Sequence, residues 1–262
     1  MLYLYHGTTS VCAIKVRLTL EEKALPWKGE VLGLQKGDQY RPDYLKLNPN
    51  AVVPTLVHDG KVVIESTIII EYLDEAFPEI ALMPRDPYAR SQARLWLRRV
   101  DDLHVYTGTL TTAVAFRHYF MRQIPDGRDA YVARVADPAK RQRLARIMTD
   151  GLAATEALEA AQRHDAFIGQ METALGQSDY LAGSAFSLAD IAAVPYVNRC
   201  AVLGLAGLWD NHRPRVADWF ARMRQRPSFA TAITAWWDDD ARQRFDVARE
   251  EVWAECARVL KR

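Results

Sequence analysis

The sequence predicts an α+β domain followed by an all-α domain, and three observations support this. In the first 80 residues, short β-branched or aromatic runs alternate with stretches that carry apolar residues at helical spacing. Pro78, Pro84 and Pro87 then interrupt the chain. The residues beyond them show helical patterns alone. We therefore expect a first domain over residues 1–80, a linker over 81–91 and a helical domain over 92–262.

The first domain is predicted to follow the order β-α-β-α-β-β-α, which is the thioredoxin-like arrangement. We expect strands at residues 2–5, 27–34, 55–58 and 61–64, and helices at residues 11–24, 43–47 and 67–73. The hairpin is the clearest local signal. Asp59-Gly60 separates its two strands, and this pair supplies the positive φ angles of a type I′ turn.

The second half is predicted to be helical throughout. Residues 88–123 contain no proline and follow an approximate apolar stripe, with Gly108 as a bend. Asp137-Pro138 predicts a helix start, and that helix is expected to run to residue 175. Ser187 and Asp190 form a variant of the capping box. Two short helices at 214–226 and 228–237 precede a charged helical tail at 238–262.

Residues 47–73 combine features that favour a ligand site. Pro54 opens a hairpin strand, which leaves the backbone groups before it outside the ladder of the sheet. Ser66 lies near a helix start, where unpaired N–H groups attract a carboxylate. A proline-started edge strand followed by a capped helix explains the same residues without a ligand.

The run VPTL, then DG, then ES before an apolar helix resembles the glutathione-binding domain of the glutathione transferase family. The resemblance implies that Val53 precedes a cis-proline, Pro54, and pairs its backbone with the cysteinyl part of glutathione. It implies that Glu65 and Ser66 hold the γ-glutamyl end. Gln39 lies where serine-type members often contact the glycyl end, although a solvated loop amide fits equally well. The glutathione transferase fold, glutathione as co-substrate, no metal and a homodimer are implied too.

The catalytic group is expected just after the first strand. SVCAIKVRLTL resembles the SSCxxxVRIAL run of serine-type members, especially the zeta class, and this places Ser10 on their catalytic serine. Its hydroxyl would stabilise the glutathione thiolate by a hydrogen bond. Cys12 is a rival, since a shift of two residues matches the cysteine of beta-class members, and Thr9 is another. Val11 departs from the second serine of the run.

The second substrate is expected between the two domains. Tyr5 and His6 would line one side, and an aromatic-rich helix would line the other with Tyr106, Phe116 and Tyr119. Aromatic residues at this spacing are also typical of a helical core, so both readings stay open.

Composition narrows the classes of partner. Of the 262 residues, 49% are hydrophobic and 26% charged, and the net charge of +1 gives no field that would recruit nucleic acid or an anionic membrane. No apolar run approaches the ~20 residues of a membrane span. Cys12, Cys200 and Cys256 show neither a CxxC pair nor metal-ligand spacing. We expect a cytoplasmic protein with reduced thiols.

The predicted reaction is attack by the glutathione thiolate on a small hydrophobic electrophile that bears an aromatic group. The run ESTIIIEYLDEAFPE is similar to bacterial glutathione-dependent β-etherases, which cleave β-aryl ethers at the carbon bearing the ether oxygen. Three alternatives remain. These are a thiol reductase using Cys12, a zeta-like isomerase in aromatic catabolism, and a non-enzymatic binding module on the same fold.

Overall fold

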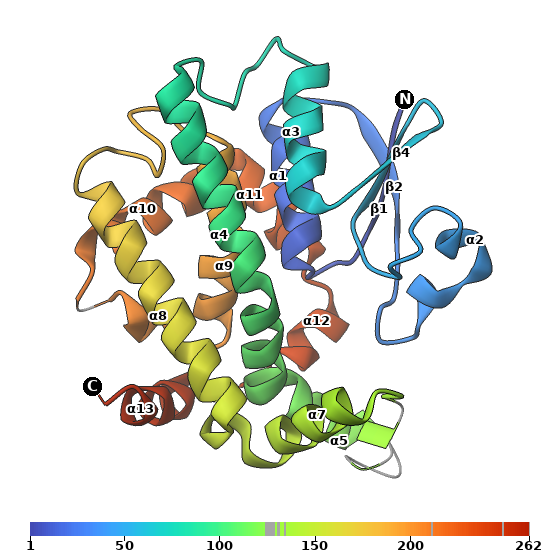
Figure 1. The fold of residues 1–262 in the computed structure, drawn as a ribbon, viewed down its shortest axis with the longest axis vertical. Helices are drawn as coiled ribbons and strands as arrows, with labels where there is room; N and C mark the ends of the chain where they lie inside the picture. The colour runs from blue at the N-terminus through green and yellow to red at the C-terminus, as the bar shows by residue number, and fades with distance from the viewer. Residues whose placement is uncertain (124–128, 130–131, 134, 211, 248, 262) are drawn as a thin grey trace. The chain divides into compact units, whose positions relative to one another are not determined.

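The computed structural model describes the chain except residues 124–128, 130–131, 134, 211, 248 and 262 (Figure 1). Its contacts group the described residues into two compact units. The first comprises Met1–Arg98, Gln177–Pro195 and Trp219–Asp238, and the second comprises Arg99–Gly176, Tyr196–Asp218 and Asp239–Arg262. The first unit therefore takes in two segments from late in the chain. The sequential division into 1–80, 81–91 and 92–262 stays a prediction.

The first unit contains a four-stranded sheet in the order β2-β1-β3-β4. Its strands are β1 (Leu2–His6), β2 (Trp27–Val31), β3 (Thr55–His58) and β4 (Lys61–Ile64). Strand β1 runs parallel to β2 and antiparallel to β3, and β3 and β4 form the predicted hairpin. The turn residues Asp59 and Gly60 have φ angles of 48° and 80°, as the Asp-Gly pair predicts.

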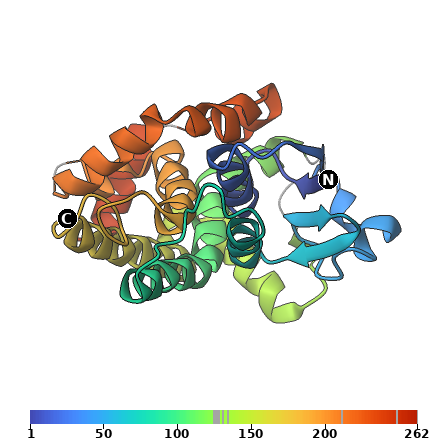
Figure 2. The same ribbon diagram turned by 90° about the horizontal axis from the view of Figure 1, so that it is seen from above.

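Helices cover both faces of this sheet. Helices α1 (Val11–Glu22) and α3 (Ser66–Ala76) lie on one side and the short α2 (Pro42–Leu45) on the other (Figures 1 and 2). Strand β1 alternates accordingly, because successive side chains point to opposite faces. Leu2, Leu4 and His6 are buried, whereas Tyr3 and Tyr5 are half-buried and Tyr5 packs on Tyr44 of α2 with ring centroids 5.5 Å apart.

A late segment of the chain packs against α1. Helix α11 (Pro227–Ala232) and a 3-10 turn, Thr234–Trp236, follow α10 (Pro214–Gln225). Arg226 forms a bidentate ion pair with Glu22 at the end of α1, with distances of 2.7 Å from Nε to Oε1 and 2.6 Å from Nη2 to Oε2. Its guanidinium also stacks over Phe186 at 3.7 Å from the ring centroid. This fork fixes α11 on α1.

The predicted capping box opens α9 (Leu188–Val202). Asp190 accepts hydrogen bonds from the backbone N–H of Ser187 at 3.1 Å, from Leu181 N–H at 3.1 Å and from Trp219 Nε1 at 2.9 Å. Burial raises the pKa of Asp190 to about 6, and these donors oppose the rise. The box therefore joins the two late segments of the first unit, Gln177–Pro195 and Trp219–Asp238, and has a structural role.

The second unit is helical and more interrupted than the sequence predicts. Its elements include the later part of α4 (Pro87–Thr111), a π-helical turn Thr112–Phe116, α5 (Arg117–Gln123), α7 (Pro138–Asp150), α8 (Thr155–Leu175), α12 (Asp239–Arg244) and α13 (Arg249–Val259). The single helix predicted over 137–175 is wrong, because Gly151 breaks it with φ 58° and ψ −126°. Gly108 lies inside α4, and the irregular turn begins at Thr112 instead.

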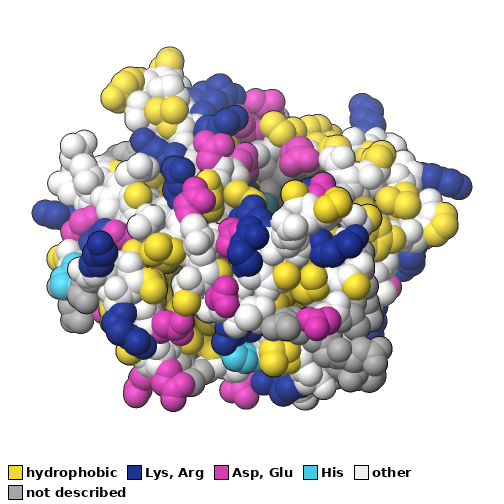
Figure 3. Space-filling model, turned by 60° about the horizontal axis from the view of Figure 1, so that its bottom comes forward, with side chains coloured by type: hydrophobic (Ala, Val, Ile, Leu, Met, Phe, Trp, Pro, Cys, Tyr) yellow, Lys and Arg dark blue, Asp and Glu magenta, His cyan; other side chains and the backbone are white. Residues whose placement is uncertain are grey.

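Acidic and basic side chains are interspersed on the face drawn in Figure 3. Such mixing agrees with the near-zero net charge of +1. In the described part of the chain, no helix combines the length and the apolar character needed to cross a bilayer.

Candidate functional site

Strand register brings the predicted glutathione-binding residues to one end of the sheet. Tyr5 pairs with Thr55, and Thr55 pairs with Ile64. The segments that continue beyond these three residues are therefore neighbours: the loop after β1, the residues before β3 and the start of α3. A Cβ placed on Gly7 of that loop would lie 3.4 Å from Ser10 Cβ and 3.6 Å from Val53 Cγ2. Gly7 thus lies close to both Ser10 and Val53, two of the predicted residues.

Ser10 is the N-cap of α1. Its backbone is extended, with φ −64° and ψ 120°, and its Oγ accepts a hydrogen bond from Ala13 N–H at 3.3 Å. A hydroxyl that accepts at one lone pair still has its proton to donate elsewhere. The side chain is half-buried. Ser10 thus offers a donor at the N-terminus of a helix, where negative charge is stabilised.

The two rivals of Ser10 lie on either side of it. Thr9 is buried, at 6% exposure. Cys12 is half-buried in the first turn of α1. The N-terminus of a helix stabilises negative charge, so a thiolate is favoured at this position. Geometry alone therefore leaves Ser10 and Cys12 as competing assignments.

The peptide bond between Val53 and Pro54 is cis. The preceding carbonyl of Val52 accepts hydrogen bonds from Tyr44 Oη and from Asn48 Nδ2, the latter at 3.0 Å. Asn48 also donates to Thr55 Oγ1 at 3.0 Å. In the described part of the chain, the Val53 backbone makes no backbone–backbone hydrogen bond outside regular elements. Its N–H and C=O are therefore suited to pair with an extended peptide, as a strand edge does.

Glu65 and Ser66 stand at the start of α3. Glu65 is an exposed non-glycine residue with φ 66° and ψ 113°, and its side chain does not cap the helix. Strained backbone of this kind clusters at ligand-binding positions. Ser66, the first residue of α3, is 6% exposed. The uncapped N–H groups of the first turn are suited to a carboxylate, such as the one at the γ-glutamyl end of glutathione.

Gln39 is held in the loop between β2 and α2. Its Nε2 donates to Leu34 O at 3.2 Å, whereas its Oε1 is buried and has no hydrogen-bond partner. An unsatisfied acceptor of this kind is costly unless a ligand supplies a donor. Glutathione has such a donor in its glycyl amide N–H. Because Oε1 is buried, a glycyl N–H would reach it only after the loop rearranges, and contact between Gln39 and glutathione stays a prediction.

Arg17 is a further functional candidate, which the sequence alone does not distinguish from an ordinary charge on a helix face. It is fully buried in α1 and donates from Nη1 to Gly7 O at 3.0 Å and from Nη2 to Thr8 O at 2.8 Å. Burial lowers its pKa to about 9, so it remains a cation at neutral pH. It therefore holds the loop that carries Ser10. In the sequence, Arg17 follows Ser10 by about two helical turns, and this spacing is the signal that could have identified it.

The structure separates Tyr5 from His6. His6 is 1% exposed and packs edge-on against Trp236, with ring centroids 4.6 Å apart. Burial, and then the charge of Arg17, lower the pKa of His6 to about 3. Tyr5 lies on the opposite face of the sheet against Tyr44. These contacts favour a packing role for both, and their place in a substrate wall stays a prediction.

Tyr106, Phe116 and Tyr119 belong to the second unit. Phe116 packs on Phe245 with ring centroids 5.6 Å apart, and Tyr119 Oη donates to Asp240 at 2.9 Å. Tyr106 Oη donates to Glu159 at 3.1 Å. Phe116 and Tyr119 thus border a packed aromatic cluster, as the core alternative expects. Their contact with a substrate stays a prediction.

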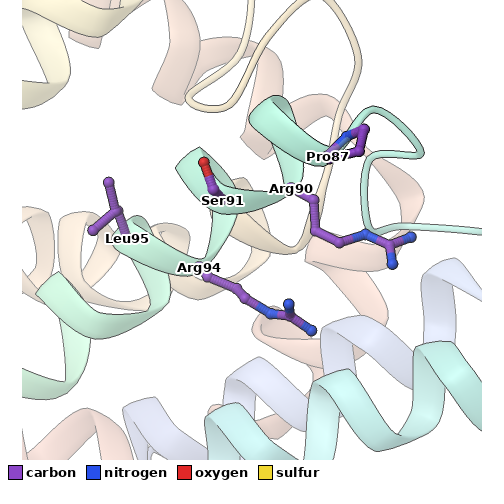
Figure 4. A pocket seen from close by; sticks show the side chains of 5 residues that line it. All are labelled: Pro87, Arg90, Ser91, Arg94 and Leu95. Atoms are coloured by element: carbon purple, nitrogen blue, oxygen red, sulfur yellow. The ribbon is translucent and has the colours of Figure 1, made fainter.

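One surface cavity of about 480 Å³ is lined by the first turns of α4. Pro87, Arg90, Ser91, Arg94 and Leu95 form its wall (Figure 4). Arg94 is paired with Glu71 of α3 at 2.9 Å. These residues belong to none of the predicted glutathione contacts. Among the described residues, no group of three His, Cys, Asp or Glu side chains is placed to hold a metal ion.

Comparison with known proteins places this geometry in a family. Residues 4–81 match the model for the glutathione S-transferase N-terminal domain, and residues 128–227 match the model for its C-terminal domain. Protein LigF of Sphingobium sp. (strain NBRC 103272 / SYK-6) is 29% identical over 233 residues, which are 87% of this chain and 91% of that protein. A tetrachloro-p-hydroquinone reductive dehalogenase of Sphingobium chlorophenolicum is 28% identical over 245 residues, covering 87% and 94%.

The fold agrees with the sequence matches. The crystal structure of beta-etherase LigF from Sphingobium sp. strain SYK-6 aligns with a TM-score of 0.75 at 27% identity, covering 88% of this chain and 98% of that one. The predicted fold class, a thioredoxin-like domain followed by an all-α domain, is confirmed. The chain therefore belongs to the glutathione S-transferase family and is a glutathione transferase enzyme, in a family that uses glutathione as co-substrate.

Proposed function

We propose that this enzyme binds glutathione along the Val53, Glu65 and Ser66 segments, with Gln39 at the glycyl end, and ionises its thiol with the Ser10 hydroxyl. The observation that carries the proposal is the convergence, at one end of the sheet, of an N-cap hydroxyl, a strand-like backbone before a cis-proline and an uncapped helix start. The hydroxyl suits the thiol of glutathione, the strand-like backbone suits its peptide backbone, and the helix start suits its γ-glutamyl carboxylate.

The thiolate then attacks a small aromatic-bearing electrophile. For a β-aryl ether, a C–S bond forms at the carbon bearing the ether oxygen, the C–O bond breaks, and the electron pair leaves with the phenolate oxygen. The similarity to beta-etherase LigF over 87% of this chain supports this substrate class. A role in detoxification or aromatic catabolism, in the cytoplasm, follows from the same proposal.

The experiment is a turnover assay with glutathione and a β-aryl ether whose phenol is fluorescent. We expect release of the phenol together with a glutathione thioether of the expected mass. An isomerase would convert its substrate without consuming glutathione, and a binding module would bind glutathione without any turnover. The proposal is refuted if neither phenol release nor a glutathione adduct is detected, with ethers or with aryl halides.

Cys12 supports a second candidate function. Its place in the first turn of α1, and the reductive dehalogenase among the relatives, favour exchange between a Cys12 thiolate and a glutathionylated substrate. The Cys12 thiolate attacks the glutathione sulfur of the conjugate: an S–S bond forms, the bond between that sulfur and the substrate breaks, and the substrate keeps the electron pair and takes up a proton. A second glutathione thiolate then attacks the mixed disulfide, leaves as glutathione disulfide and restores the Cys12 thiol. Mass spectrometry of trapped enzyme would show this adduct, and Cys12→Ser would abolish it.

We also propose that the enzyme forms a homodimer through α3 and the first turns of α4. Ile68 of α3 is 55% exposed and Leu95 of α4 is 47% exposed. An ion pair between Glu71 and Arg94 joins the two helices. Exposed apolar residues on neighbouring helices mark candidate interaction surfaces. Light scattering should give twice the mass of 29.7 kDa, and Leu95→Glu should shift it toward the monomer.

A further inference from the structure

The guanidinium of Arg17 connects four segments of the first unit. Besides Gly7 O and Thr8 O, it contacts His6 Nδ1 at 2.9 Å from Nη1, and it donates from Nε to Ala232 O at 2.8 Å. Its fifth contact is with Trp236, whose ring centroid lies 4.9 Å from Cζ. Four of the five N–H donors of the planar fork thus contact groups fixed in the fold.

These contacts bear directly on Ser10. The Gly7 carbonyl, which accepts from Arg17, also accepts from Ser10 N–H at 3.4 Å. Arg17 and Ser10 therefore share one acceptor, and the turn between residues 7 and 10 is fixed at its start by a cation. Hydrogen bonds to charged groups are stronger than those between neutral groups. The direction of the Ser10 hydroxyl depends on a turn that this guanidinium holds.

The late segment of the chain holds Arg17 in turn. Ala232 ends α11, and Trp236 lies in the 3-10 turn after it. Trp236 is itself fixed, because its Nε1 donates to Thr231 O at 3.0 Å. Its ring covers both the guanidinium and the His6 imidazole. A cation over a tryptophan face is attracted to the negative face of the ring, most strongly where water is excluded.

We propose that Arg17 is a positioning residue for thiol activation, which holds the turn of residues 7–10 so that Ser10 faces the sulfur, and that Ala232 and Trp236 complete this lock. The inference rests on the proposed function of Ser10. Arg17 and Trp236 are proposed to act through the position of Ser10 and not through contact with glutathione. Their replacement should therefore raise the pKa of the bound thiol although the Ser10 hydroxyl is still present.

The test measures the pKa of the thiol of bound glutathione by ultraviolet absorbance of the thiolate in wild type, Arg17→Met, Arg17→Lys and Trp236→Ala. We expect Arg17→Met to raise this pKa by about one unit, which is a tenfold lower thiolate fraction below the pKa. Arg17→Lys should give a smaller rise, because an ammonium lacks the planar fork. Trp236→Ala should also raise the pKa, by less than Arg17→Met.

Arg226→Met is the matched control. Arg226 also anchors α11 to α1, yet its partner Glu22 lies 12 residues after Ser10, about 18 Å along the helix. This variant should lower the melting temperature and leave the thiol pKa unchanged. If Arg17→Met does not fold, Arg17→Lys and Trp236→Ala perform the same comparison on folded protein.

The outcomes separate the two proposals. A wild type that shows no depressed thiol pKa overturns the proposed function. A wild type with a depressed pKa that is retained in the Arg17 variants, while their melting temperatures fall as in Arg226→Met, overturns this inference alone. A pKa that rises in Arg17→Met but not in Trp236→Ala refutes the part assigned to the late segment.

Discussion

Replacement of Ser10 by alanine removes two contacts that the structure shows or offers. The first is the cap, in which Ser10 Oγ accepts from Ala13 N–H at 3.3 Å. The second is the hydroxyl proton, which that cap leaves free for the glutathione sulfur. The cap affects the stability of α1, and the proton affects the ionisation of the thiol. Ser10→Ala changes both the stability of α1 and the ionisation of the thiol, so a second variant is needed to distinguish the two effects.

The expected magnitudes differ. Loss of a serine N-cap costs about 0.5–2 kcal/mol of stability. Loss of a hydrogen bond to a charged group costs about 1.5–3 kcal/mol, which at about 1.4 kcal/mol per unit raises the thiol pKa by roughly 1–2 units. The helix N-terminus persists in the variant and keeps about 0.3–1 kcal/mol of thiolate stabilisation. The pKa should therefore rise toward the free value of ~8.5 without reaching it.

The assay follows thiolate absorbance against pH for glutathione bound to wild type, Ser10→Ala, Ser10→Gly and Cys12→Ala. Glycine at an N-cap costs only a few tenths of a kcal/mol relative to serine. Ser10→Gly should therefore match Ser10→Ala in thiol pKa while staying closer to wild type in melting temperature. Cys12→Ala should leave the thiol pKa at the wild-type value. Equal shifts in the Ser10 and Cys12 variants would refute the assignment of Ser10.

Three further outcomes are expected. Gly29 of β2 pairs with Leu4 of β1. Gly29→Ala should destabilise the protein by about 1–3 kcal/mol in urea titration, because the added Cβ would clash with Leu4 O; an unchanged midpoint would contradict this close approach of the two strands. Asp190→Ala should cost about 3–5 kcal/mol, since it leaves buried donors without an acceptor, and retention of most of the stability would contradict its role. Burial lowers the pKa of His164 from 6.5 to about 4. The unfolded chain therefore binds the extra proton, and stability should fall by up to about 1.4 kcal/mol per unit as pH drops from 6.5 to 4. His164→Gln should flatten that slope, and an unaltered slope would assign it to other groups.

Local chemistry explains which features the sequence could predict. The Asp59-Gly60 turn, the Ser10 cap and the Asp137 cap each depend on residues within a few positions, so their structural positions follow directly from the sequence. Strand register then decides which loops meet. The Asp59-Gly60 turn fixes the register of β3 and β4, whereas the alternation in β1 determines only which face each side chain points to. The convergence at the end of the sheet is thus only partly predictable from the sequence.

Long-range contacts explain what could not be predicted. The acceptor of Arg17 at Ala232 lies 215 positions away in the chain, and no local pattern marks it. Without that partner, a buried arginine looks like an ordinary helix-face charge, and His6 looks available to a substrate. The break at Gly151 did have a local signal in its glycine, but the apolar spacing on both sides masked it.

The return of residues 226–236 to α1 has a consequence for biosynthesis. During translation, the sheet and α1 emerge from the ribosome long before Arg226, Ala232 and Trp236 are made. The nascent N-terminal segment can form its hydrogen-bonded sheet early, but the turn that carries Ser10 waits for its last supports until almost nine-tenths of the chain exists. Full competence to bind and ionise glutathione should therefore be among the last properties that the newly made enzyme gains.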